Sequence, residues 1–252
     1  MITVKKPLAI LLLSLPLIVT AQEKKPVSQV GINYSVDYCY RTLDGNAYEK
    51  MIIDMRNESE VGIIGFNTGA TYSYQFKKGL LLEGGFQFTR VGEQLKSITF
   101  TTSQGDVGEG RFANYYDYVG IPIKIGYGLP VGKRLRLSIM SGISTNFFLA
   151  RQIRSSVTYN NGTSENYSST YKKEPYGTQF EDVNLVSVSS LGIDIRVFRA
   201  FSLRIEPTFR YSITPIMDAP IKQRPYSAGL NTSVFFSFGT KKRVAIKETV
   251  AP

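Results

Sequence analysis

The most constraining feature of this sequence is a strict alternation of apolar and polar residues from Phe201 to Thr214. The apolar positions are Phe201, Leu203, Ile205, Pro207, Phe209, Tyr211 and Ile213. A period of two that persists over about fourteen residues separates two faces only in an extended strand. Strands of soluble proteins usually have about five or six residues, whereas a strand tilted across a bilayer needs about 9–11. We therefore predict a transmembrane β-strand here.

Similar alternation recurs in seven other segments, about 30–40, 64–76, 80–91, 116–129, 134–148, 183–197 and 226–239. Long connections at about 41–62, 92–114, 150–182 and 215–225 alternate with short ones at 77–79, 130–132 and 198–200. This order is typical of outer-membrane barrels, which have short periplasmic turns and long extracellular loops. The sequence predicts an all-β fold, an eight-stranded antiparallel up-and-down transmembrane β-barrel with both termini in the periplasm.

The composition of the polar face favours a membrane barrel over a soluble lipocalin-like barrel with an apolar cavity. That face consists mainly of Gly, Ser, Thr and Asn, and small residues suit the narrow interior of eight strands. Aromatic residues are expected in two outward bands, as at membrane interfaces. The extracellular band would hold Tyr38, Tyr40, Phe88, Tyr116, Phe147, Tyr211 and Tyr226. The periplasmic band would hold Tyr72, Tyr74, Phe76, Tyr127, Phe198, Phe201, Phe236 and Phe238.

Charged residues on the polar face are predicted to pair inside the barrel, because unpaired buried charges cost several kcal/mol. The expected cluster consists of Asp37, Glu83, Lys124, Arg136, Asp194, Arg196, Arg204, Glu206 and Arg210. A hairpin turn at 198–200 would place Asp194 opposite Arg204 and Gly192 opposite Glu206. We interpret the cluster as structural filling that plugs the interior; a proton or ion path is the alternative.

The first 21 residues have the features of a signal peptide. Lys5 and Lys6 precede an apolar stretch at 8–19, and the small residue Ala21 suits cleavage. An uncleaved anchor helix is disfavoured, because Pro16 and the polar residues 22–25 interrupt the apolar segment. We expect a signal peptide at 1–21, the barrel domain at 22–239, a short basic periplasmic tail at 240–252, and an outer-membrane location in a Gram-negative bacterium.

The residue types present restrict the chemistry. The chain contains no histidine and one cysteine, Cys39, so the usual histidine-dependent hydrolases and His/Cys metal sites are excluded. We expect neither enzymatic activity nor a cofactor. Calcium held by Asp44, Asn46, Glu49 and Asp54 is a weaker interpretation than a solvated loop. The formal charge of +10 is spread over loops and strands, so no nucleic-acid partner is expected.

Three segments and the closing strand carry a family resemblance. They are 118–127 (YVGIPIKIGY), 141–146 (SGISTN), 203–211 (LRIEPTFRY) and the last strand up to Phe238. On these residues the chain resembles the PorT-like outer-membrane β-barrel family of Bacteroidota, which is similar to the small OmpA- and OmpX-type barrels. The resemblance implies the barrel fold, and we carry no activity over from it.

The expected function is that of a non-enzymatic, monomeric outer-membrane barrel that presents extracellular loops for binding or stabilises the membrane. Its expected partners are outer-membrane lipid, lipopolysaccharide and an unknown protein at the loops. The Tyr-rich third long connection, with Tyr159, Tyr167, Tyr171 and Tyr176, would form a binding surface or pack on itself. Two alternatives are a lipid-modifying enzyme and a transport or secretion accessory that contacts periplasmic machinery through Lys241, Lys242, Arg243 and Lys247.

Overall fold

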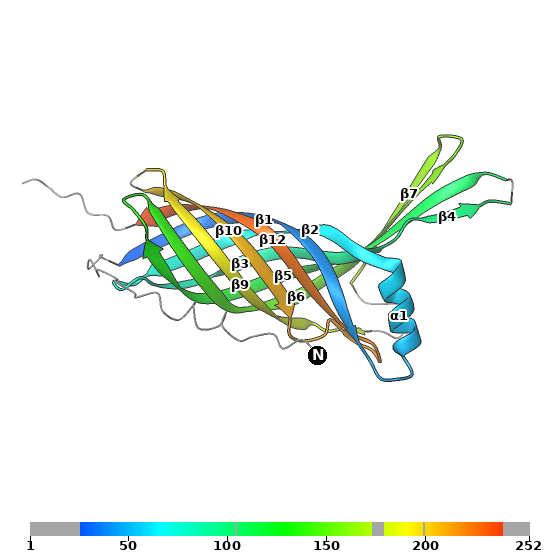
Figure 1. Cartoon of the computed structure of the whole chain (residues 1–252), viewed down its shortest axis with the longest axis horizontal. Coiled ribbons are helices and arrows are strands. Elements are labelled where there is room, and N and C mark those ends of the chain that lie inside the picture. The colour runs from blue at the N-terminus through cyan, green and yellow to red at the C-terminus, as the bar shows by residue number, and fades with distance from the viewer. Residues whose placement is uncertain (1–25, 104, 173–178, 199, 239–252) are drawn as a thin grey trace, which may run out of the picture.

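The computed structural model describes residues 26–103, 105–172, 179–198 and 200–238, and eight long strands form a closed barrel (Figure 1). These are β1 (Val27–Asp44), β2 (Glu60–Gln75), β3 (Leu80–Leu95), β5 (Val107–Pro130), β6 (Leu135–Tyr159), β9 (Val183–Arg196), β10 (Phe201–Ser212) and β12 (Lys222–Phe238). Each pairs antiparallel with the next, and β12 pairs with β1. The predicted eight-stranded up-and-down arrangement is confirmed. The expected signal peptide 1–21 and tail 240–252 lie outside the described residues.

The two ends of the barrel differ in their connections. Val27 pairs with Gln75 and Ser28 with Phe238, so both described chain ends lie beside the first short turn. We call this end, with its short connections after β2, β5 and β9, the turn end, and the opposite end the loop end. Gly79 has a φ of +91°, a backbone conformation that glycine adopts without steric cost.

The loop end contains more regular structure than the sequence predicted. The first long connection holds the helix α1 (Lys50–Ser59). Strands β5 and β6 continue beyond the barrel wall, and β4 (Ile98–Thr101) and β7 (Ser164–Tyr171) pair with their outer edges. We call this extension, made of 98–101, 107–112, 150–159 and 164–171, the arm; it leans away from the barrel axis (Figure 1). The long connections 92–114 and 150–182 thus contain paired strands that the sequence did not predict, because backbone pairing continues where apolar alternation stops.

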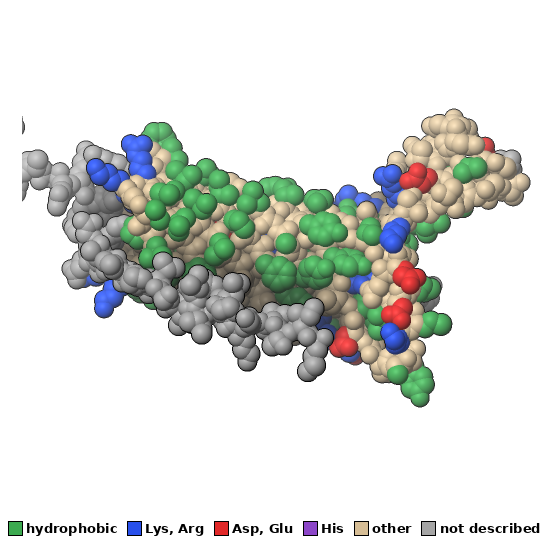
Figure 2. Space-filling view, in the orientation of Figure 1, with side chains coloured by type: hydrophobic (Ala, Val, Ile, Leu, Met, Phe, Trp, Pro, Cys, Tyr) green, Lys and Arg blue, Asp and Glu red, His purple; other side chains and the backbone are tan. Residues whose placement is uncertain are grey.

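The barrel has the reverse polarity of a water-soluble one. Large apolar side chains point outward along the wall, among them Ile32 (70% exposed), Phe86 (66%) and Ile123 (61%). Figure 2 shows apolar side chains spread along the visible flank of the barrel. Charged side chains such as Arg204 and Glu83 are completely enclosed instead. Among the described residues, no helix has the length and apolar character needed to cross a bilayer.

Aromatic side chains cluster toward both ends of the apolar wall. Near the turn end, Phe236 packs edge-on against Phe201 and Phe238, with ring centroids 5.2 and 4.9 Å apart. Near the loop end, the Tyr226 ring contacts Tyr40 at 6.1 Å. The expectation that Tyr116 joins the loop-end outer band was wrong. Tyr116 is 2% exposed, because its even position on β5 points into the barrel, opposite to the outward Val119 and Ile121.

Candidate functional site

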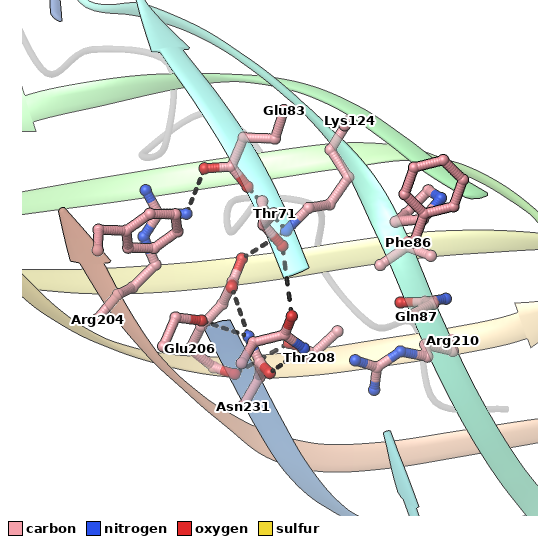
Figure 3. Close-up of a pocket in the computed structure, with 16 residues that line it drawn as sticks. Thr71, Glu83, Phe86, Gln87, Lys124, Arg204, Glu206, Thr208, Arg210 and Asn231 are labelled. Carbon is pink, nitrogen blue, oxygen red and sulfur yellow. Dashed lines mark hydrogen bonds and ion pairs between the residues drawn. The ribbon is translucent and has the colours of Figure 1, made fainter. Parts of the chain in front are cut away.

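The centre of the barrel interior is occupied by Arg204 and the carboxylates around it (Figure 3). Strand β10 directs its even-numbered side chains inward, and the β9–β10 register pairs Arg204 with Asp194, as the predicted hairpin required. Arg204 Nε donates to Asp194 Oδ1 at 2.8 Å, and Nη1 donates to Glu83 on the opposite wall. The guanidinium carbon also lies 4.7 Å from the centroid of the Phe235 ring. The interior therefore connects strands that are far apart in the sequence.

Lys124 links this centre to a second carboxylate. Its Nζ lies 3.1 Å from Glu83 Oε2 and 3.3 Å from Glu206 Oε1. Asn231 Nδ2 donates to Glu206 Oε2 at 3.1 Å, and Ser190 Oγ donates to the other oxygen of Glu206. Both oxygens of a completely buried carboxylate thus have donors, which is the condition under which burying a charge is tolerated.

Two further pairs lie toward the ends of the interior. Arg136 donates to both oxygens of Asp194, at 3.2 and 3.0 Å, on the turn-end side. Arg210 Nη1 donates to Asp37 Oδ2 at 2.8 Å on the loop-end side. Including these pairs, the cluster contains equal numbers of cations and carboxylates: Lys124, Arg136, Arg204 and Arg210 against Asp37, Glu83, Asp194 and Glu206. Arg196 does not join it, because its side chain is exposed near the turn end.

Little open space remains inside this network. Among these side chains is a cavity of about 30 Å³, lined by Glu83, Lys124, Arg204, Glu206 and Arg210. That volume has room for about two water molecules. Inward glycines make close packing feasible: a Cβ on Gly192 would approach Ser138 Oγ and come within 3.4 Å of the Arg204 side chain.

A second buried polar cluster lies at the loop end, and the sequence reasoning missed it. Glu60 accepts hydrogen bonds from Arg41 Nε at 2.9 Å and from Arg56 Nε at 2.7 Å. Arg41 is 2% exposed and reaches Glu60 beneath the end of α1. The signal was present in the sequence, because Arg41 continues the inward parity of Asp37 and Cys39.

Glu93 belongs to the same cluster but is hydrogen-bonded by neutral groups. Tyr116 Oη donates to its Oε1 at 2.8 Å, and Gln223 Nε2 donates to its Oε2 at 3.1 Å. Glu93 lies five residues beyond Phe88, the last outward apolar residue of β3 toward the loop end, so it is outside the apolar wall. Burial raises the pKa of this carboxyl to about 7, although the Tyr116 hydrogen bond opposes the rise.

An apolar cluster, which we call the seal, lies at the loop-end mouth. The loop residue Ile216 packs with the inward rings of Tyr116 and Tyr118, and all three are buried. Phe180 and Met217, from the small paired strands β8 (Gln179–Phe180) and β11 (Met217–Asp218), pack on this core together with Val91 and Phe148. Two of the long connections therefore fold inward over the ion-paired interior.

A hollow of about 350 Å³ lies where the arm leaves the barrel. Its lining combines guanidinium, aromatic, amide and hydroxyl groups: Ile63, Gln94, Arg111, Phe112, Ala113, Tyr115, Arg154, Ser155, Ser156, Asn166, Tyr167 and Ser168. Figure 2 shows Lys and Arg side chains gathered at this base of the arm. Of the Tyr-rich connection, Tyr167 lines the hollow, Tyr159 and Tyr171 lie on the arm, and Tyr176 lies outside the described residues.

Comparison with known proteins gives structural likenesses only. No family model matches the chain, and no curated protein matches it, so the resemblance to the PorT-like family stays a prediction. Solved structures of small outer-membrane barrels align over most of the chain. Neisserial surface protein A has 13% identity and a TM-score of 0.41, covering 84% of this chain and 99% of that one. OprG from Pseudomonas aeruginosa has 9% identity and a TM-score of 0.47, covering 86% and 97%.

A third likeness is to the outer membrane protease OmpT from Escherichia coli, with 8% identity and a TM-score of 0.32 over 86% of this chain and 98% of that one. Because these identities and TM-scores are low, the fold assignment rests on the hydrogen-bonded ring of the chain itself.

Proposed function

We propose that the chain is an integral outer-membrane barrel with a closed interior, its turn end in the periplasm and its arm outside the cell. The observation that carries this proposal is the apolar wall. Val30, Ile32, Ile123 and Ile139 are between 44% and 70% exposed on the outer surface. In water this surface would cost about 25 cal/mol per Å², whereas lipid solvates it and a closed ring leaves no strand edge unpaired.

A structural role for the interior charges supports a non-enzymatic function. Glu83, Asp194 and Glu206 each contact at least one cation, and the chain supplies no histidine to act as a general base. The cavity between them admits water but has no room for a substrate. The arrangement holds the wall strands together, and the carboxylates that accept from Ser138 and Ser190 are also bound to Arg136, Arg204 or Lys124.

The arm is the element best suited to contact other molecules. Strands β5 and β6 each extend from the wall into the arm and stay paired, with one register shift at Asp117/Tyr118, so the barrel wall positions the arm. Its outer strand, SENYSSTY, offers tyrosines, serines and an asparagine. Such residues provide contact area with few rotatable bonds, together with adaptable hydrogen bonding. We therefore assign presentation of the arm as the function of the barrel.

The membrane assignment is tested by arginine substitution at different depths. Ile123→Arg, near the middle of the wall, should cost about 2–4 kcal/mol of folding free energy in lipid vesicles, and Val131→Arg at the turn end about 0–1. Urea titration of the refolded protein measures both values. Equal, small effects at the two positions would contradict the proposal, as would a mature chain that stays soluble without detergent.

The scaffold assignment is tested by removing the arm. Replacing 97–111 and 155–171 with short Gly-Ser turns leaves all eight wall interfaces in place, because β4 and β7 pair only within the arm. The armless barrel should reach the outer membrane and fold there. Folding is read from a difference in mobility on SDS gels between unheated and heated samples. Failure to assemble would show that the arm is needed for folding and is not an appendage that the barrel displays.

A further inference from the structure

The hollow at the base of the arm opens on the same face as the apolar wall. Along β5, the odd-numbered residues point outward in the wall, and the same parity continues through Asp117 and Tyr115 to Arg111. The register then pairs Ala113 with Arg154 and Arg111 with Ser156. Arg154 is therefore on the outward side, and the hollow lies at the boundary between the apolar wall and water.

Two arginines give this corner its charge. Arg154 is exposed, its Nε donates to Gln152 Oε1 at 3.0 Å, and its guanidinium carbon lies 5.1 Å from the centroid of the Tyr115 ring. Both of these partners are neutral. Arg111 contacts Glu109 at 3.1 Å, but that pair is solvent-exposed and contributes little. An anion entering the hollow can therefore recruit both guanidinium groups.

The other lining groups define the kind of anion. Arginine forks bind phosphate oxygens with two parallel hydrogen bonds, and the Ser156, Ser168 and Asn166 side chains can add hydrogen bonds to sugar hydroxyls. Farther down the same face, past the Arg90–Asp117 ion pair, the apolar wall runs through Val119 and Ile121, which are both 37% exposed. A ligand that fits all three features has a phosphate, a sugar and acyl chains.

We propose that this corner binds the phosphorylated sugar headgroup of an outer-leaflet glycolipid, with Arg154 as the principal phosphate ligand. This inference rests on the proposed membrane orientation, in which the loop end faces outside. The glycolipid would then be held against β5 by its acyl chains and against the arm by its phosphate. Basic pockets at a membrane surface bind anionic lipid headgroups by this combination of forces.

Native mass spectrometry of the folded barrel, released from a neutral detergent, tests the site with three probes: diphosphoryl lipid A, its monophosphoryl form and inorganic phosphate. We expect diphosphoryl lipid A to bind, and Arg154→Gln to weaken that binding by about tenfold or more, as loss of a charge-assisted contact would. The matched control is Arg134→Gln, which removes the same charge from an exposed position at the turn end and should change nothing.

The outcomes separate this inference from the function on which it depends. Equal binding to wild type, Arg154→Gln and Arg134→Gln would overturn the site. Inorganic phosphate that competes as well as lipid A would overturn the assignment to a lipid headgroup. After either result the membrane assignment still holds if Ile123→Arg loses more folding free energy in lipid vesicles than Val131→Arg does. A small Ile123→Arg effect would instead overturn the membrane assignment itself.

Discussion

Arg204 is completely buried and contacts carboxylates on two strands of different walls, Asp194 on β9 and Glu83 on β3. Arg204→Met keeps most of the volume but leaves both carboxylates short of a cation. Because breaking a buried pair leaves an uncompensated charge, we expect a loss of about 3–5 kcal/mol in unfolding free energy. Urea titration in detergent measures it. Arg196→Gln, at the exposed turn end, serves as the control and should stay within about 0.5 kcal/mol.

Glu93 should make the barrel less stable as the pH rises. The folded-state pKa of this carboxyl is about 7, above the ordinary value of 4.5, so the folded chain retains a proton that the unfolded chain releases. Its stabilising contribution is therefore complete below pH 4.5 and is lost as the pH rises through about 7, amounting to about 3 kcal/mol.

The substitution Glu93→Gln isolates this effect. The amide can still accept from Tyr116 and cannot ionise, so unfolding midpoints at pH 5 and pH 8 should differ less than in the wild type. Glu58→Gln, on the exposed side of α1, should retain the wild-type pH dependence. If Glu93→Gln and wild type lose the same stability between the two pH values, Glu93 does not keep its proton in the folded barrel.

At the scale of single elements, the first short turn depends on Gly79. Its φ of +91° places it in the left-handed region, where a branched side chain costs about 1–3 kcal/mol. Gly79→Val should therefore destabilise the barrel by that amount in the same urea assay. Gly132→Val in the second turn is the matched control, because Gly132 has no positive φ and an added Cβ would meet no atom within 4 Å beyond its chain neighbours. Equal costs at the two turns would contradict the argument.

The elements differ in how well the sequence predicted them. The eight wall strands were predictable because each must be apolar on one face where it crosses the wall, which imposes a visible period of two. The helix α1 was missed within a polar segment, although Tyr48, Met51, Ile52 and Met55 follow helical spacing and remain exposed. The strand β7 carried no signal, since SENYSSTY pairs through its backbone without burying an apolar face.

The charged interior was predictable only in part, for a reason that belongs to the barrel as a whole. A hairpin turn fixes the register of neighbouring strands, so the Arg204–Asp194 pairing followed from the position of one turn. The contact of Arg204 with Glu83 spans the lumen, and it depends on the tilt and stagger of all eight strands. Arg41, Glu60 and Glu93 were missed because the strands were expected to end sooner than they do.

For the whole molecule, the plugged interior that we propose predicts that no sugar passes through the barrel. Arg204, Lys124 and their carboxylates lie in the middle, and the Tyr116–Ile216 seal lies at the loop end. Proteoliposomes should therefore not swell in isotonic arabinose, whereas a water-filled porin reconstituted beside them should swell within seconds to minutes.

The same swelling assay can locate the barrier to sugar, either in the ion-paired interior or in the seal at the loop end. Removing the seal alone, with Ile216→Ala and Phe180→Ala, should leave the vesicles tight, because the ion-paired layer below remains intact. Swelling by the wild type would show a continuous water path and would contradict a plugged barrel. Swelling only after the seal is removed would place the barrier at the loop end, and the charges beneath it would then line a gated pore.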